Sequence, residues 1–249
     1  MNTFFLLVSL IGSLLAIIII FLNRKRILQN AKLNIIKKHL DKKIDKKAEI
    51  KESSVNLPTG KRLEYKKLIN RAEILIEHHE TKEAEKILIS LLADNKKYAP
   101  ALRILSSLYL QRKQYSKSEA LYNTLNEIEK GENPTTLSNL AFCLFERNQI
   151  KKAHNLYKQA LLKDIKNIKR YTNLGQVIYV LKEYDEAVSL FKKALHIDPR
   201  NTDILFMLAD TYLALKLFSK AKETFKKILQ YEPYSQDARA ELLRMDSEV

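Results

Sequence analysis

The residue types that most often carry out chemistry are few in this sequence, and their spacing supports no reaction. The five histidines are His39, His78, His79, His154 and His196. None of them pairs with another at four-residue spacing or lies near the single cysteine, Cys143, which argues against a metal site on a helix. The chain also lacks a glycine-rich phosphate loop and a serine or cysteine nucleophile motif. We therefore expect a protein that is not an enzyme and needs no cofactor or metal.

The scarcity of turn residues indicates helices joined by short connections. The 249 residues include only four glycines and five prolines, and no stretch alternates apolar and polar residues as a surface strand does. We therefore expect an all-α fold. Cys143 lies among apolar residues in a helical pattern, so we expect a small buried side chain and no internal disulfide.

The chain is strongly basic, with a formal net charge of +15. Residues 1–60 hold 11 Lys and Arg against 4 Asp and Glu, which is a net +7 in the first quarter of the chain. A charge of this size suggests an anionic neighbour, either nucleic acid or lipid.

A pattern of residue types recurs at a constant interval in the C-terminal half. Residues 168–201 contain Leu174, Gly175, Ala187 and Phe191, and similar residues occur 34 positions earlier and later. The earlier set includes Leu140, Ala141, Ala153 and Tyr157, and the later set includes Leu208, Ala209, Ala221 and Phe225. A constant period of this length predicts stacked helical hairpins. Gly175 and Ala187 would lie where the two helices of one hairpin cross, because a larger side chain there would hold the helices apart.

This pattern resembles the tetratricopeptide repeat. The family's signature places are held here by Tyr171, Leu174, Gly175, Ile178, Ala187, Phe191, Ala194 and Pro199. The resemblance implies a right-handed superhelical solenoid of antiparallel helix pairs over residues 63–249. The expected units are residues 65–98, 99–132, 134–167, 168–201 and 202–235, followed by a capping helix at 235–246. The first unit departs from the pattern, because Arg71 replaces the usual leucine and Thr81 the usual aromatic residue.

An apolar run precedes the repeats. Residues Phe4 to Leu22 contain no charge and would form a helix about 28 Å long, close to the hydrocarbon thickness of a bilayer. A secretory signal peptide, the main alternative, would carry basic residues before the run, whereas Arg24, Lys25 and Arg26 follow it. We therefore expect residues 1–23 to be a single-pass anchor in the inner (plasma) membrane. The positive-inside rule then predicts an outside amino terminus and cytoplasmic repeats.

Residues 24–52 form a basic segment between the anchor and the repeats. Leu33, Ile36, Leu40 and Ile44 fall at helical spacing among many lysines, which predicts an amphipathic helix. Three interpretations stay open: a solvated spacer, a helix lying along anionic lipid, and a short coiled coil that joins two copies. Residues 53–62 break the helical pattern and are the expected linker.

The resemblance also implies a concave groove lined by the first helix of each unit. Family positions that point into the groove are held here by Arg103, Ser107, Asn139, Phe142, Phe145, Lys169, Asn173, Gln176, Tyr179, Phe206, Met207 and Asp210. Aromatic anchors beside side-chain amides suit an extended peptide. The alternative is that these side chains pack against the next unit. Capture of a carboxyl terminus by Arg103, Asn139 and Lys169 is a narrower possibility that the family suggests.

The sequence therefore predicts a membrane-anchored scaffold or adaptor that binds a peptide or protein partner, with homo-oligomers possible. Relatives of this type imply a role in envelope assembly, secretion or pilus biogenesis. A basic nucleic-acid-binding helical repeat is the alternative, although no regular base-reading pair recurs in the units.

Overall fold

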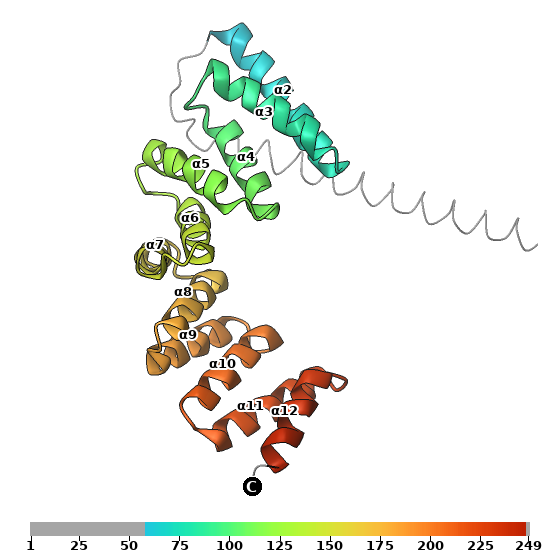
Figure 1. Ribbon diagram of the computed structural model, residues 1–249, viewed down its shortest axis with the longest axis vertical. Helices are drawn as coiled ribbons and strands as arrows, with labels where there is room; N and C mark the ends of the chain where they lie inside the picture. Colours follow the sequence, from blue (N-terminus) through green and yellow to red (C-terminus); the bar gives the residue numbers. More distant parts are fainter. Residues whose placement is uncertain (1–57, 248–249) are drawn as a thin grey trace, which may run out of the picture. The chain divides into compact units, whose positions relative to one another are not determined.

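The structure is a computed structural model that describes residues 58–247. This range contains eleven α-helices and no strand, which confirms the all-α prediction for the described residues (Figure 1). The predicted anchor at 1–23 and the basic segment at 24–52 lie outside the described residues. Among residues 58–247, no helix has both the length and the apolar character needed to cross a membrane.

The helices form five pairs and one final helix. The pairs are α2 (Thr59–Glu77) with α3 (Thr81–Asp94), α4 (Ala99–Gln111) with α5 (Tyr115–Ile128), α6 (Pro134–Glu146) with α7 (Ile150–Lys163), α8 (Ile168–Val180) with α9 (Tyr184–Ile197), and α10 (Thr202–Ala214) with α11 (Phe218–Tyr231), and the last helix is α12 (Gln236–Ser247). Each helix packs against the one before it and the one after it. The described residues therefore form a helical solenoid.

The first helix begins earlier than the sequence predicted. The expected linker ran to residue 62, but α2 starts at Thr59, so the last four linker residues are helical. Pro58 explains the early start, because its φ of −54° suits a helix entrance and its carbonyl oxygen accepts the Arg62 N–H at 3.0 Å.

Asparagine side chains start the first helices of the last three units. Asn133, Asn167 and Asn201 precede α6, α8 and α10, and each side-chain oxygen accepts a backbone N–H of the first turn. Such caps satisfy donors that have no partner inside the helix. The same cap, recurring once in each repeat, sets the start of each of these units.

The turns inside the units use left-handed residues that are not glycine. His79, Lys113, Asn148, Lys182 and Lys216 all have φ between 56° and 65°. In the α8–α9 turn, the Lys182 N–H donates to the Tyr179 carbonyl at 2.9 Å and the Glu183 N–H to the Ile178 carbonyl at 3.1 Å. These bonds close the end of the first helix and reverse the chain within a short turn.

The core consists of small residues at the crossings and large residues between them. Ala153, Ala187 and Ala221 are fully buried, as the repeat pattern predicts. A Cβ atom on Gly175 would lie 2.7 Å from Cε1 of Phe191, so Gly175 leaves room for the Phe191 ring of its own unit. On α12, Ala238 and Met245 are buried against the preceding units, as expected of a capping helix.

Candidate peptide-binding groove

The predicted groove residues lie on the first helices α4, α6, α8 and α10. Direct contacts join α2 to α4 and α8 to α10, so the first helices lie side by side in these two pairs of units. The structure then separates predicted residues whose side chains are held within the protein from those that are free to bind.

The polar groups of the α4–α6 part are already bonded within the protein. Arg103 forms an ion pair with Glu129 at 2.5 Å, and the Asn139 side-chain amide donates to the Tyr122 hydroxyl at 2.9 Å. Burial raises the pKa of Tyr122, while hydrogen bonds from Ser106, Asn139 and Ser107 act against that rise. Two of the three residues suggested for carboxylate capture are thus engaged elsewhere.

The predicted aromatic anchors differ in how far they are exposed. Phe142 on α6 is 37% exposed and contacts the Tyr115 ring edge-to-face at 6.0 Å. Phe145 is half-buried against the core, and Phe206 packs edge-to-face on the fully buried Phe225 at 6.0 Å. Phe145 and Phe206 therefore follow, at least in part, the alternative that these side chains pack within the protein, whereas Phe142 is more exposed.

The α8–α10 part presents side chains that have few internal partners. Within residues 58–247, the side chains of Lys169 and Asn173 make no hydrogen bond or ion pair. The Gln176 amide lies 3.5 Å from the Met207 sulfur, which is a weak contact between the two helices. These four residues place a cation, two amides and a thioether together on one surface.

Asp210 and Tyr179 complete this surface, and α12 extends it. The pKa of Asp210 is raised, mainly because neighbouring protein reduces its hydration and also because Glu241 lies close by. Burial, Asp210 and Tyr184 likewise raise the pKa of Tyr179. Asp210 is nevertheless exposed to solvent. Sequence reasoning missed Glu241, although it holds the repeat position that Met207 holds in the preceding unit.

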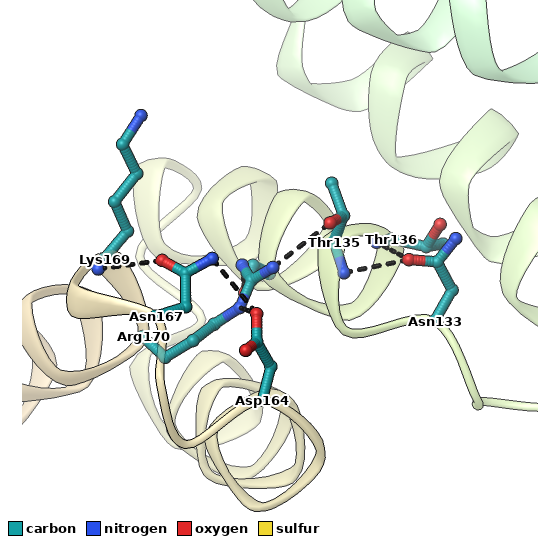
Figure 2. Close-up of polar contacts among 8 residues, drawn as sticks. Asn133, Thr135, Thr136, Asp164, Asn167, Lys169 and Arg170 are labelled. Atoms are coloured by element: carbon teal, nitrogen blue, oxygen red, sulfur yellow. Dashed lines mark hydrogen bonds and ion pairs between the residues drawn. The ribbon is translucent and has the colours of Figure 1, made fainter. Parts of the chain in front are cut away.

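A buried arginine joins α8 to α6 (Figure 2). Arg170 is 6% exposed, its Nη1 donates to the Ser138 hydroxyl at 2.7 Å, and its Nη2 donates to the Thr135 hydroxyl at 3.1 Å. Its Nε lies 3.6 Å from a carboxylate oxygen of Asp164 but has no hydrogen bond. Asp164 in turn accepts a hydrogen bond from the Asn167 side chain at 3.0 Å. This network fixes how the fourth unit packs on the third.

A shallow hollow lies away from the predicted groove. Its volume is about 510 Å³ and its lining residues are Arg200, Thr202, Gln230, Tyr231 and Glu232. Thr202 donates to Glu232 at 2.6 Å, and the Arg200 guanidinium lies 6.0 Å from the centre of the Tyr231 ring. The hollow is therefore formed where the α9–α10 turn meets the end of α11.

Residues that could bind a metal ion do not gather in the part of the chain that the structure describes. No group of three or more His, Cys, Asp or Glu side chains there could hold a metal ion. Cys143 is buried, as predicted, and burial raises the pKa of its thiol.

Comparisons with known proteins identify the repeat. Tetratricopeptide-repeat family models match residues 144–202 and 181–244. The solved structure of MamA from residue 41 to its end, from Desulfovibrio magneticus, is 14% identical with a TM-score of 0.65, and the match covers 69% of this chain and 97% of that chain. YrrB, described as a TPR protein with an unusual peptide-binding site, is 21% identical with a TM-score of 0.62, and the match covers 70% of this chain and 89% of that chain. The structure of pilF from Pseudomonas aeruginosa is 18% identical with a TM-score of 0.58, and the match covers 70% of this chain and 78% of that chain. No curated protein sequence matches this chain significantly. This chain therefore contains tetratricopeptide repeats, and its described part has the fold of a tetratricopeptide-repeat solenoid.

Proposed function

We propose that this chain is a scaffold that binds a peptide or protein partner on the surface formed by α8 and α10. The observation that carries this proposal is that the polar side chains on this surface have few hydrogen-bond or ion-pair partners within the described residues, whereas Arg103 on α4 and Asn139 on α6 are bonded. Lys169 and Asn173 have no side-chain partner within residues 58–247, and Gln176 has only the Met207 sulfur.

The chemistry of this surface suits an extended peptide. The amides of Asn173 and Gln176 each offer a donor and an acceptor, which matches the alternating groups of a peptide backbone. Tyr179 and Met207 are half-buried and supply apolar area beside them. A peptide-binding site is also named for YrrB, which shares the fold but only 21% of its sequence with this chain.

The scaffold acts at the inner membrane in this proposal. Residues 1–23 anchor it with the amino terminus outside, the basic segment at 24–52 contacts anionic lipid, and the repeats lie in the cytoplasm. A tether raises the effective concentration of membrane-bound partners, so a weak groove affinity suffices. The chain acts by binding, without catalysis, in a process such as envelope assembly, secretion or pilus biogenesis.

Site-specific photo-crosslinking tests the surface directly. A photoreactive residue at position 173, on α8, should crosslink a partner in cells, whereas the same residue at the exposed position 159, on α7, should not. Gln176→Ala combined with Met207→Ala should weaken the captured complex by about tenfold or more, because both contacts with the partner are lost. Equal crosslinking from positions 173 and 159 would exclude the α8–α10 surface.

Membrane topology needs a separate measurement. Ser90→Cys places a thiol at an exposed position on α3. A membrane-impermeant maleimide should label this thiol only after the cells are broken open. Labelling in intact cells would show that the proposed orientation is reversed.

A further inference from the structure

Two lysines from different helices lie over one tyrosine ring of the fifth unit. The ammonium groups of Lys192, on α9, and Lys220, on α11, lie 6.0 Å and 5.8 Å from the centre of the Tyr212 ring on α10. Tyr212 is only 6% exposed, so its ring has a fixed place in the core. An ammonium at this distance from a ring centre is attracted to the ring. We name these three residues the lysine–tyrosine site.

The polar groups of the site lack an acceptor. Within residues 58–247, Lys192 and Lys220 form no ion pair, and the Tyr212 hydroxyl makes no hydrogen bond. The hydroxyl oxygen is not among the unpaired polar atoms that are sealed from solvent, so it reaches the surface. A hydroxyl and two ammonium groups are all donors, and together they suit an acceptor that carries negative charge.

The second unit contains the same arrangement with a carboxylate in place. Tyr109 and Lys117 hold the repeat positions of the site's tyrosine and its α11 lysine, and the Lys117 ammonium lies 5.2 Å from the centre of the Tyr109 ring. The Tyr109 hydroxyl donates to a carboxylate oxygen of Glu85, on the preceding second helix α3, at 2.8 Å. Burial acts to raise the pKa of this carboxyl group, but the hydrogen bonds from Tyr109 and Arg112 and the charge of Lys117 lower it. The second unit therefore shows that this arrangement binds an ionised carboxylate.

The fifth unit lacks a carboxylate at the corresponding place. Val188, on α9, holds the repeat position of Glu85. The arginine that pairs with Glu85 is replaced by Leu215, while Lys192 replaces Ile89, so two cations remain. The fifth unit thus keeps the tyrosine hydroxyl and two positive charges, but the chain itself supplies no acceptor for them.

The nearest carboxylates on the two second helices do not take that place. Glu223 lies three residues after Lys220 on α11, yet it forms no ion pair within the described residues. Asp185 and Glu186 lie about two turns before Lys192 on α9. These groups keep their charge, so Glu223 should weaken the binding of any further anion at the site.

We propose that the lysine–tyrosine site binds a carboxylate side chain from an acidic segment of a partner protein. The Tyr212 hydroxyl donates to this carboxylate, as the equivalent tyrosine does in the second unit, and Lys192 and Lys220 supply the opposite charge. A step of two residues turns a helix by about 200°, so Tyr212 faces away from Asp210 on α10. The site is therefore separate from the peptide surface on α8 and α10.

Carbodiimide coupling tests the contact directly. The full chain in neutral detergent is mixed with a hexaglutamate peptide whose termini are acetylated and amidated, so that only side-chain carboxylates can react. Carbodiimide joins a carboxylate to a lysine amine that it contacts, and mass spectrometry locates the lysine. Coupling should be stronger at Lys192 and Lys220 than at Lys158 and Lys226, which are exposed but lie over no tyrosine ring of the described residues. Equal coupling at all four lysines would overturn the proposal.

Fluorescence anisotropy of the labelled peptide then separates a built site from general attraction to a basic protein. Tyr212→Phe keeps the ring and the net charge but removes one donor, so it should weaken binding by about fivefold. Tyr109→Phe is the matched control and should leave binding unchanged, because that hydroxyl is already bonded to Glu85. Val188→Glu should also weaken binding, since it places a carboxylate of the chain itself beside Tyr212. If this last variant fails to fold, the comparison of the two phenylalanine variants still decides the result.

Charge variants complete the test. Lys192→Gln with Lys220→Gln should weaken binding by about tenfold, and Glu223→Gln should strengthen it by about threefold. Lys158→Gln with Lys226→Gln makes the same change in charge as the first pair and should have a smaller effect. Equal losses from both lysine pairs with no effect of Tyr212→Phe would overturn the proposal. Binding of a phosphoserine peptide without binding of the glutamate peptide would also overturn it.

Discussion

The α4–α6 and α8–α10 parts of the predicted groove carry similar residues at equivalent places, yet they behave differently. Asn139 and Asn173 hold the same repeat position in adjacent units. Asn139 donates to Tyr122, but no hydrogen bond joins Asn173 to Tyr157, the tyrosine at the corresponding place on α7. The comparison teaches that a repeat position fixes where a side chain lies, while its neighbours decide whether it is free to bind.

The same contrast holds for charged groups. Arg103 on α4 is neutralised by Glu129, whereas the side chain of Lys169 on α8, which holds a different repeat position, has no partner within residues 58–247. Arg170, the residue after Lys169, is buried and links the two parts through Ser138. These two adjacent cations on α8 therefore have different roles: Arg170 holds neighbouring helices together, and Lys169 faces solvent.

Breaking the link between the two parts should have the largest effect. Arg170→Ala removes the donors to the Ser138 and Thr135 hydroxyls and the ion-pair partner of Asp164. It should lower the free energy of unfolding by about 3 kcal/mol. Urea titration followed by circular dichroism measures the change. Lys169→Ala, one residue earlier and exposed, is the matched control and should stay within about 0.5 kcal/mol of wild type. Equal losses in both variants would show that the network does not join the units.

Gly175→Ala should disturb the packing of the α8–α10 part. The new methyl group would lie 2.7 Å from Cε1 of Phe191, whose ring is 1% exposed and has little room to move. We expect a loss of about 2 kcal/mol in the free energy of unfolding. Gly60→Ala, with nothing within 4 Å of its Cβ, should instead stabilise α2 by up to about 1 kcal/mol. A neutral Gly175→Ala would mean that the Phe191 ring shifts at little cost.

The two asparagines offer the sharpest comparison of the groove parts. Asn139→Ala removes a bond to a buried tyrosine hydroxyl and should cost about 1 kcal/mol in stability. Asn173→Ala should leave stability within about 0.5 kcal/mol but reduce crosslinking to the partner from a photoreactive residue at position 169. Thermal unfolding and crosslink yield, measured on both variants, separate the two roles. If Asn139→Ala reduced crosslinking without loss of stability, and Asn173→Ala lost stability instead, the binding surface would lie on α4 and α6.

Asp210→Asn should give the smallest change, and that change should depend on pH. The folded protein raises the pKa of Asp210, so stability is lost as the pH rises from the ordinary value of 3.8 through the folded value. The asparagine variant should be more stable at neutral pH by less than about 1 kcal/mol, because solvent screens this exposed group, and equal to wild type in acid. Melting temperatures across this pH range measure the difference. Asp203→Asn controls for the general loss of one negative charge, and a gain that persists in acid would contradict the assignment.

Local patterns predicted the helices and the small residues at the crossings well. The constant period locates the helix pairs of the later units, and buried alanines such as Ala187 occur where the pattern requires them. The left-handed turns were not predicted, because lysine replaces the usual glycine at positions such as Lys182.

The site was less predictable than the fold. Phe206 was predicted to line the groove, and its ring also packs against Phe225 from the next helix. Arg170 and Glu241 were not singled out. Arg170 donates a hydrogen bond to Ser138, the neighbour of Asn139, and Glu241 contributes to the raised pKa of Asp210. Contacts of this kind join residues far apart in the sequence, and a pattern within one unit does not contain them.

The amino-acid sequence by itself determined the helical class, the length of the repeating unit and the places that must hold small side chains. These properties follow from periodicity and side-chain volume along one helix pair. Only the tertiary structure decided which polar side chains are bonded internally, because hydrogen bonds such as that from Asn139 to Tyr122 form between units once the helices have packed. The binding surface on α8 and α10 is what remains after those internal bonds have formed.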